Sequence, residues 1–492
     1  MNKSPDVVVV GAGSAGLYAA LTAAREGART VLISQAALAT TASYWAQGGI
    51  AAALGDDDSV ELHQADTLAA GRHLGRVSAV RTLVENCAAA VDDLISLGVD
   101  FDREGDQLAL GLEGGHSRRR VVHAGGSATG RRITRQLSAR AAAHPLIEVI
   151  EHASAKALVV TDGRCVGVRV EVDGKSRTIA ARAIVMATGG SAALWSRSTN
   201  PPAAVGAGLL MAHAAGAQLA DLEFLQFHPT ALLSGGRNQG FLITEAARGE
   251  GATLLDENGD RFVDELSPRD EVAAAVERKI AGKDGAASPV FLDMRMIDPL
   301  LFPNVFTKIE EAGFDPRKQP IPVAPAAHYT MGGISCDLNA RSSLPGLLAV
   351  GECSCTGLHG ANRLASNSLA ECMVFGRRAA LAAIAESPVA EATLKAAQSG
   401  EITPSEYSPD PDPAATRELL WSYAGIERNE ADLSRLAASP NPLVRLIGAN
   451  SLARKETRGA HHRVDFPQLD HALDFMHFVT GDDEPPHLER WE

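Results

Sequence analysis

Residues 347–375 read LLAVGECSCTGLHGANRLASNSLAECMVF. The first four residues predict a short apolar strand, and the apolar run from Leu369 predicts a helix. Small residues let the loop between them lie close to a ligand, Arg363 adds a cation, and Ser366-Asn367-Ser368 offers side chains that cap the helix. This order predicts an anion or cofactor site at the helix start. The alternative is a plain strand-to-helix connection with a buried arginine.

A second strand-loop-helix unit stands at the start of the sequence. Residues 6–10 read DVVVV, which predicts a buried parallel strand, and a helix is expected over 17–26. The G-x-G-x-x-G pattern between them predicts dinucleotide binding, because glycines let the backbone approach a pyrophosphate that faces the positive helix end. The residues assigned to this cradle are Gly11, Ala12, Gly13, Ser14, Ala15 and Gly16.

The next predicted strand, over 30–33, lacks the acidic residue that usually binds an adenosine ribose. Ser34 and Gln35 follow it instead, so another group must hold the ribose, and Gln35 is kept as a candidate. The missing acid also argues against an ordinary NAD-dependent dehydrogenase.

Composition narrows the class of protein further. The 492 residues carry a net charge of −14, which argues against a nucleic-acid partner. The six cysteines show no C-x-x-C spacing, so we expect reduced thiols and no metal site, and Cys353-x-Cys355 is poorly placed for a redox disulfide. No apolar run of about 18 residues predicts a membrane span. No signal peptide fits the polar start, so we expect a cytoplasmic protein.

The run that begins at Gly351-Glu352 and ends at Asn367-Ser368-Leu369 resembles a known signature. It matches G-E-x-x-x-x-G-x-H-G-A-N-R-L-x-x-N-S-L, the C-terminal FAD signature of the succinate dehydrogenase/fumarate reductase flavoprotein family. The resemblance implies FAD as the cofactor. It also implies an α/β fold with a Rossmann-like FAD-binding domain, an inserted α+β capping domain and a C-terminal helical domain.

These domains are assigned to continuous stretches of the sequence. The FAD-binding domain is expected in two parts, and a Pro- and Ser-containing linker is expected before the helical domain. The bounds are 1–235 and 329–390 for the FAD-binding domain, 236–328 for the capping domain, 391–413 for the linker and 414–492 for the helical domain.

Several segments resemble the flavin contacts of this family. Residues 42–50 are similar to its flavin-contacting loop, and Ala42 stands where one branch has a histidine bonded to FAD, so the resemblance implies a non-covalent cofactor. Residues 200–208 depart from the family pattern, because Val205 and Ala207 replace a threonine and an aspartate. The further cofactor residues that the resemblance implies are Ser43, Gln47, Gly48, Gly49, Gly189, Glu352, Ser368 and Leu369.

Other segments resemble the family's substrate site. The implied catalytic residues are His228, Thr244, Arg269, His328 and Arg363. In reductases of the family the residue matching Arg269 is the acid that protonates fumarate; here it either takes part in proton transfer or only stabilises charge. Arg248 and Glu250 are expected to form a structural pair.

Glu113 precedes Gly114-Gly115-His116-Ser117, which resembles the branch of the family that oxidises L-aspartate. A carboxylate there can pair with a substrate ammonium, which succinate lacks. The alternative is an acid in a surface loop.

The resemblance implies FAD-dependent oxidation of L-aspartate to iminosuccinate, with oxygen or fumarate as electron acceptor. This is the first step of de novo NAD biosynthesis toward quinolinate, and the resemblance also suggests hand-off of the product to a quinolinate synthase as a partner. One alternative is a fumarate reductase or succinate dehydrogenase flavoprotein subunit, against which stand Ala42 and Glu113. The other is a flavin-binding regulatory protein without turnover, which would not need the implied catalytic set.

Overall fold

The computed structural model describes residues 4–38, 41–236, 238–282, 287–407, 410, 412–481 and 484–492. At its centre lies a sheet whose five strands follow the order β19-β12-β1-β2-β8. All neighbouring strands in it run parallel, which confirms the predicted Rossmann-like α/β class. The strands are β1 Val7–Val10, β2 Thr30–Ile33, β8 Ile147–Ile150, β12 Ala183–Met186 and β19 Leu347–Ala349.

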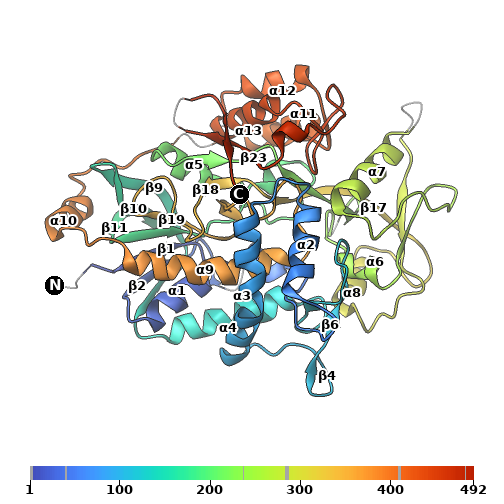
Figure 1. Ribbon diagram of the computed structural model, residues 1–492, viewed down its shortest axis with the longest axis horizontal. Coiled ribbons are helices and arrows are strands. Elements are labelled where there is room, and N and C mark those ends of the chain that lie inside the picture. The colour runs from blue at the N-terminus through green and yellow to red at the C-terminus, as the bar shows by residue number, and fades with distance from the viewer. Residues whose placement is uncertain are drawn as a thin grey trace.

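The four valines of β1 are buried on both faces of this sheet, because each face is covered. Val7 and Val9 pack into a core shared with the helices, and Val8 and Val10 pack into a second core that contains Leu158. The second face carries an antiparallel sheet of β9 Ala153–Thr161, β10 Arg164–Val172 and β11 Lys175–Ala180. On the first face α1 and α9 pack together (Figure 1). The helices there are α1 Ser14–Arg25, α3 Val77–Ser96, α4 Thr129–Ala143 and α9 Asn367–Ala385.

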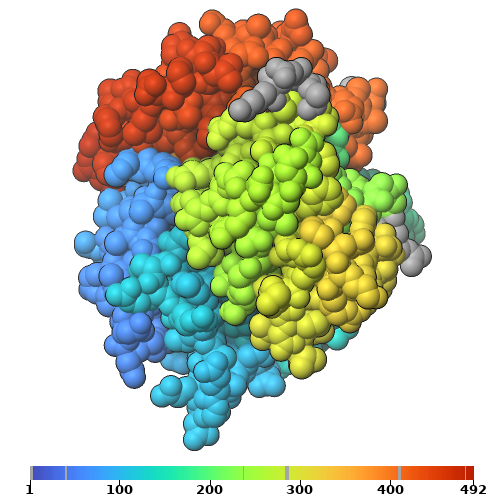
Figure 2. Space-filling model, turned by 90° about the vertical axis from the view of Figure 1, so that its right-hand side faces the viewer, coloured from blue at the N-terminus to red at the C-terminus, as the bar shows by residue number. Residues whose placement is uncertain are grey.

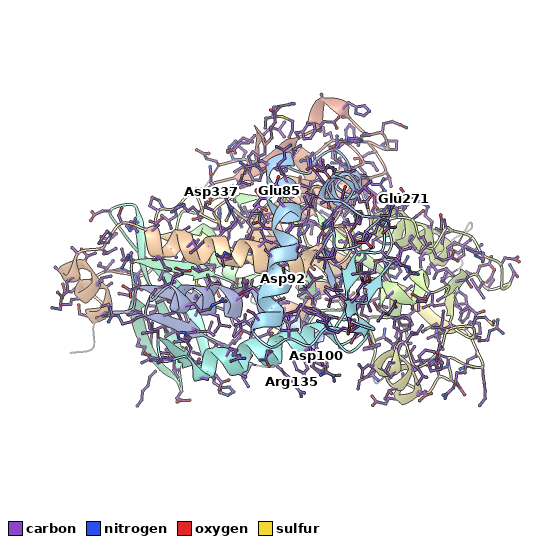
Figure 3. The ribbon with its side chains drawn as sticks, turned by 60° about the horizontal axis from the view of Figure 1, so that its bottom comes forward. Glu85, Asp92, Asp100, Arg135, Glu271 and Asp337 are labelled. Atoms are coloured by element: carbon purple, nitrogen blue, oxygen red, sulfur yellow. The ribbon has the colours of Figure 1, made fainter. Side chains whose placement is uncertain are left out.

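Helix α3 shows how the sequence pattern sets the packing. Leu83, Cys87 and Leu94 are among the buried residues on one side of the helix. Glu85 and Asp92 are exposed on α3, where Figure 3 labels them. The apolar spacing of three to four residues therefore buries one face of α3 against the core. The preceding helix, α2, spans Val60–Ala70.

The capping segment leaves and rejoins the core through two paired strands. β14 Leu225–Leu232 runs antiparallel to β17 Ile321–Thr330, with Leu232 opposite Val323. The capping segment has an apolar core of its own, which includes Leu254 and Val272. Figure 2 shows the segment, in yellow-green to yellow, beside the blue N-terminal segments. Its elements are α6 Glu245–Gly249, β15 Thr253–Leu255, α7 Arg269–Ala281, β16 Val290–Asp293 and α8 Pro303–Glu311.

The described part of the C-terminal segment contains the expected helices and, in addition, four strands, of which β21 Glu427–Arg428 and β22 His462–Arg463 pair with each other. The helices are α11 Pro413–Tyr423, α12 Glu430–Ala437 and α13 Pro442–Ala453. β23 Met476–Thr480 pairs with β13 Leu219–Ala220 of the core, and β24 His487–Arg490 pairs with β23. An entirely helical segment over 414–492 is therefore wrong for its last part, because the core offers β13 as a pairing edge.

The stretch predicted as a linker also contains a helix. α10 Glu391–Ser399 lies against the antiparallel sheet, and its Ala397 packs with Val159 and Val166. Residues 408, 409 and 411 of that stretch lie outside the described residues. Within the described part of the chain, no helix combines the length and apolar character that crossing a membrane requires.

Candidate active site

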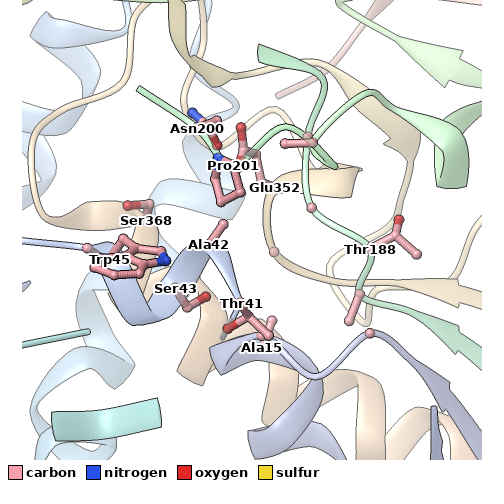
Figure 4. A pocket seen from close by; sticks show the side chains of 18 of the residues that line it. Ala15, Thr41, Ala42, Ser43, Trp45, Thr188, Asn200, Pro201, Glu352 and Ser368 are labelled. Atoms are coloured by element: carbon pink, nitrogen blue, oxygen red, sulfur yellow. The ribbon is translucent and has the colours of Figure 1, made fainter. Parts of the chain in front are cut away.

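A cavity of about 850 Å³ opens at the carboxyl ends of the central strands. Its lining includes Val10 at the end of β1, Ala187 after β12 and Val350 after β19, and it extends to Arg269 of the capping segment. Ligands of open parallel sheets bind at this edge. Figure 4 shows side chains from separate parts of the sequence, among them Ser43, Asn200 and Ser368, around the cavity.

The glycines at the start of the chain fill different needs. Gly11 has φ +111°, and a Cβ on it would lie 2.1 Å from the Ala187 carbonyl oxygen. A Cβ on Gly16 would lie 1.9 Å from the Gly11 carbonyl oxygen, so Gly16 lets α1 pack closely against the β1 turn. Ser14 uses its backbone N–H to bond Ser43 Oγ at 3.1 Å.

The cavity brings together nearly all residues assigned to the cofactor. Ser14 and Gly16 stand just behind its wall and do not line it. The predicted cofactor residues that line the cavity are Gly11, Ala12, Gly13, Ala15, Gln35, Ser43, Gln47, Gly48, Gly49, Gly189, Glu352, Ser368 and Leu369.

The residues present fit FAD. Gly13 is the N-cap of α1 and makes no side-chain capping bond, so this helix start presents backbone N–H groups without a capping side chain. A side chain in place of Gly11 would collide with the Ala187 backbone, so this glycine lets the turns after β1 and β12 lie close together in the cavity wall. Ala42 lines the cavity at the position where the resemblance implied no covalent link. Of the two departures in the 200–208 loop, Ala207 lines the cavity and Val205 packs against the core.

Glu352 is a half-buried carboxyl at the cofactor end. Burial raises the pKa of Glu352 to about 7, although the Thr330 backbone N–H, which donates to Oε1 at 3.0 Å, opposes the shift. A Cβ on Gly190 would lie 2.3 Å from the same oxygen. The side chain is thus held in one place by its neighbours.

Arg363 reaches the cavity from the loop before α9. Its Nη1 donates to Ser368 Oγ at 3.0 Å, and its guanidinium carbon lies 4.5 Å from the ring centroid of Tyr329. Burial, together with the nearby charge of Arg269, lowers the pKa of Arg363 to about 10. The Arg363 Nε atom is buried and has no hydrogen-bond partner among the described residues. This cation is therefore held ready for an anion.

Two histidines stand together on the paired strands. The rings of His228 on β14 and His328 on β17 are 5.2 Å apart and almost perpendicular. Burial and the charge of Arg269 lower the pKa of both rings well below the usual range, so both are neutral. His228 Nδ1 accepts the Thr230 backbone N–H at 3.3 Å, which places the ring proton on Nε2. That atom has no hydrogen-bond partner in the described part of the chain.

Arg269, the first residue of α7, is fixed by two acceptors. Its Nε donates to Glu245 Oε2 at 2.5 Å, and its Nη1 donates to Gln226 Oε1 at 3.0 Å. The Gln226 amide in turn donates to the backbone oxygen of Arg363 at 2.8 Å. One glutamine thus connects the arginine of the capping segment to the loop before α9.

The prediction that Arg248 pairs with Glu250 is wrong. Arg248 instead lies 3.3 Å from Glu245, and Glu250 lies 4.0 Å from Arg119. Burial alone would raise the pKa of Glu245, but the charges of Arg269 and Arg248 outweigh it and lower that pKa. Glu245 is therefore a carboxylate shared by two arginines.

Glu113 lies inside the cavity wall, so the surface-loop alternative is wrong. Its Oε2 accepts a hydrogen bond from Ser366 Oγ at 2.6 Å, and its Oε1 has no hydrogen-bond partner among the described residues. A Cβ on Gly114 would lie 2.3 Å from Glu245 Oε1, which brings this segment beside the partner of Arg269. Thr244, the N-cap of α6, also lines the cavity.

Sequence reasoning missed four residues of this site. Gln226 and Glu245 stood inside the matched motifs, but only the folded geometry gives them their contacts with Arg269. Tyr329 and Ser366 are adjacent to or near assigned residues and line the cavity. Within the described residues, no cluster of three or more metal-binding side chains is present.

The comparisons with known proteins agree with this site. A family model described as an FAD binding domain matches residues 6–369. The chain is 44% identical to the L-aspartate oxidase of Caulobacter vibrioides, over 98% of this chain and 97% of the relative. It is 40% identical to the L-aspartate oxidase of a Synechocystis species, over 94% of each protein.

Among solved structures, the chain is similar to the FrdA chain of E. coli quinol fumarate reductase. The TM-score is 0.88 at 30% sequence identity, and the match covers 100% of this chain and 97% of that one. The full-length likeness to the oxidases has the higher identity. The chain thus belongs to the L-aspartate oxidase branch of the succinate dehydrogenase/fumarate reductase flavoprotein family.

Proposed function

We propose that this protein is an FAD-dependent oxidase that converts L-aspartate to iminosuccinate. The observation that carries this proposal is Glu113, a buried carboxylate with one unpaired oxygen in a cavity that also presents the cations Arg269 and Arg363. At neutral pH L-aspartate carries two carboxylates and one ammonium group. A dicarboxylate without an amine would leave the buried Glu113 oxygen unpaired, which is costly.

The chain's own residues position the substrate. Arg363 binds one carboxylate through its planar guanidinium group, and His228 donates from Nε2. Thr244 and His328 supply further polar contacts, and Glu113 pairs with the ammonium group. FAD, held by the residues that line the cavity, would supply the hydride acceptor for this reaction. Holding the α-carbon in one orientation lowers the activation barrier, by about 7–11 kcal/mol where the reacting groups are well oriented.

Arg269 is held by its carboxylate partner, since its Nε lies 2.5 Å from Glu245 Oε2. In amine oxidation it stabilises negative charge on the substrate.

The acceptor, the partner and the location complete the proposal. Oxygen or fumarate accepts the electrons. Because an imine hydrolyses in water, iminosuccinate passes directly to a quinolinate synthase. We place the reaction in the cytoplasm, since all six cysteines are free thiols and such thiols are usual there. Ala42 in the cavity wall supports non-covalent FAD.

The test is an anaerobic visible spectrum of the FAD-loaded protein during titration with L-aspartate and, separately, with succinate. We expect L-aspartate alone to bleach the flavin, with recovery in air and release of hydrogen peroxide. Bleaching by succinate alone would assign the protein to the dehydrogenase branch. A flavin that neither compound bleaches would contradict both assignments.

The second candidate, a fumarate reductase flavoprotein, rests on the likeness to the E. coli reductase. Glu113→Gln separates the two. We expect the variant to raise the KM for L-aspartate by about 10-fold or more, since a charged contact is lost, while fumarate binding changes by less than twofold. Equal weakening of both ligands would favour the reductase.

A further inference from the structure

Ser366 occupies an unusual place at the start of α9. It is the N-cap residue, with φ +61°, but its side chain makes no capping hydrogen bond to the helix. The side chain is also buried, with 5% exposure. A buried hydroxyl that does not cap its helix must satisfy its hydrogen bonds elsewhere.

Both hydrogen bonds of this hydroxyl have a fixed direction. The Gly49 backbone N–H donates to Ser366 Oγ at 3.1 Å, and a backbone N–H can only donate. The Ser366 proton is then directed to Glu113 Oε2 at 2.6 Å, because an ionised carboxylate can only accept. Ser366 therefore connects the flavin-contacting loop to the carboxylate.

The two carboxylate oxygens of Glu113 therefore have different surroundings. Oε2 is bonded to Ser366, whereas Oε1 is buried without a hydrogen-bond partner in the described part of the chain. His123 Nε2 is 4.0 Å from Oε1, beyond hydrogen-bond distance. A Cβ on Gly48 would lie 3.6 Å from Oε1, so the backbone of the flavin-contacting loop packs against this unpartnered oxygen.

We propose that Ser366 is a positioning residue that selects the amino-bearing dicarboxylate, because it holds Glu113 with Oε1 free for the substrate ammonium. This rests on the proposed function and names what gives that site its substrate class. Ser366 itself does not contact the ammonium in this arrangement. It acts through Glu113, so removing its hydroxyl has a selective effect on ligands that carry an amine.

The experiment uses Ser366→Ala and Ser366→Gly in the FAD-loaded full-length protein. Both variants lose the hydroxyl, but glycine tolerates φ +61° without strain. We expect each to raise the KM for L-aspartate by about 10-fold, the loss typical of a hydrogen bond to a charged group. The dissociation constant of fumarate, measured by calorimetry, should change by less than twofold. FAD content is measured for each variant, since Gly49 lies in the flavin-contacting loop.

A double-mutant cycle tests the route of action. If Ser366 acts through Glu113, Ser366→Ala adds no loss of L-aspartate affinity in the Glu113→Gln background. Additive losses would overturn the inference, and so would equal weakening of fumarate and L-aspartate. An activity that Ser366→Gly restores but Ser366→Ala does not would assign Ser366 a backbone role and overturn it too.

Failure of the inference and failure of the proposed function give different results. A wild-type protein that L-aspartate does not reduce overturns the proposed function and this inference with it. A wild-type protein that L-aspartate reduces, together with Ser366 variants of unchanged KM, overturns the inference alone.

Discussion

Arg269 is the residue whose surroundings are best defined. Glu245 and Gln226 hold its guanidinium group on two sides, and the histidines next to it are neutral. The strongest positive charge at this end of the cavity therefore comes from Arg269 and Arg363. A proton donor is essential when fumarate is reduced, but an amine can be oxidised with Arg269 only stabilising charge.

Replacing this arginine should separate the two reactions. We expect Arg269→Leu to lower fumarate reduction by about 10²–10⁴-fold, the usual contribution of a general acid, while part of the L-aspartate oxidation remains. Steady-state rates for both reactions are the measurement. Arg278→Leu, on the exposed face of the same helix, is the control and should change neither rate. Equal losses in both reactions would show that Arg269 has one role.

Glu352 gives a prediction for stability against pH. Its pKa is 4.5 in a solvated chain and about 7 when buried. Between these values the folded protein binds the extra proton, so stability falls as pH rises from 4.5 to 7 and then levels off. The shift amounts to about 3 kcal/mol. In FAD-free protein, urea unfolding at several pH values should show this fall, and Glu352→Gln should remove it. A fall of the same size in the variant would contradict the assignment.

At the residue scale the motifs predicted which side chains meet, but not every pairing. All implied catalytic residues line one cavity, while their roles stay predictions. Arg248 has an acidic residue on either side in the sequence, Glu245 and Glu250, and helix geometry determines which of them it contacts. Residues three apart face each other in α6, which favours Glu245, whereas Glu250 is two residues away and points elsewhere.

At the scale of elements, one contact fastens α7 to the core. Arg72, in the turn between α2 and α3, lies 2.9 Å from Asp270 and 2.6 Å from Glu271 in the first turn of α7. Glu271 is labelled in Figure 3, where α7 starts. Asp270 is buried, and burial raises its pKa in spite of Arg72. The contact holds the helix start that carries Arg269.

Removing this contact should loosen the capping segment. Arg72→Ala leaves Asp270 buried without its partner, and we expect a loss of about 1–3 kcal/mol after allowance for the partial exposure of Arg72. The value of kcat/KM should fall as well, because Asp270 directly follows Arg269 and a displaced Asp270 would move Arg269 with it. Urea unfolding and steady-state kinetics are the measurements. Arg295→Ala breaks an ion pair within the capping segment, with Asp293, and should leave kcat/KM unchanged.

Elements that belong to a recognised motif followed the sequence, and several elements outside the motifs did not. The strand before the GAGSAG turn and the helix predicted from Leu369 are both present, although the helix begins two residues earlier, at Asn367. β23 and β24 were missed, because a strand of four or five residues forms only where a partner edge such as β13 is available. α10 was missed because prolines on either side indicated a linker, whereas its Ala397 packs on the antiparallel sheet.

At the scale of the whole molecule, a buried group of charges attaches the C-terminal segment to the core. Arg454, after α13, lies 2.7 Å from Glu223 and 2.9 Å from Glu456, and all three side chains are fully buried. The same guanidinium donates to the Met476 backbone oxygen at the start of β23. Helices and strands of the segment are therefore joined at one arginine.

We expect Arg454→Met to destabilise the whole protein. Methionine keeps the apolar volume but leaves Glu223 and Glu456 buried without this cation, which costs about 3–5 kcal/mol. Chemical unfolding of the holoenzyme is the measurement. Arg435→Met, an exposed arginine in the same segment, should change stability by less than about 0.5 kcal/mol. A neutral result at Arg454 would mean that other contacts attach the segment.

The family resemblance predicted the architecture and the FAD cofactor, and both are confirmed. The domain bounds stay a prediction. The pairing of β14 with β17 was beyond sequence reasoning, because about ninety residues of the capping segment separate strands that lie side by side. Sequence spacing carries no direct record of such long-range contacts.

The order of strands in the central sheet also bears on how the protein is made. β1 and β2 are synthesised first, but β19, Glu352 and Ser368 follow only after more than two thirds of the 492 residues. During translation the N-terminal part of the cavity is therefore synthesised before the capping segment, and the segment that completes the cavity wall follows last. We therefore expect FAD to bind only after the segment that carries Ser368 has been synthesised, so that a shortage of flavin in the cell leaves complete but empty molecules rather than arrested nascent ones.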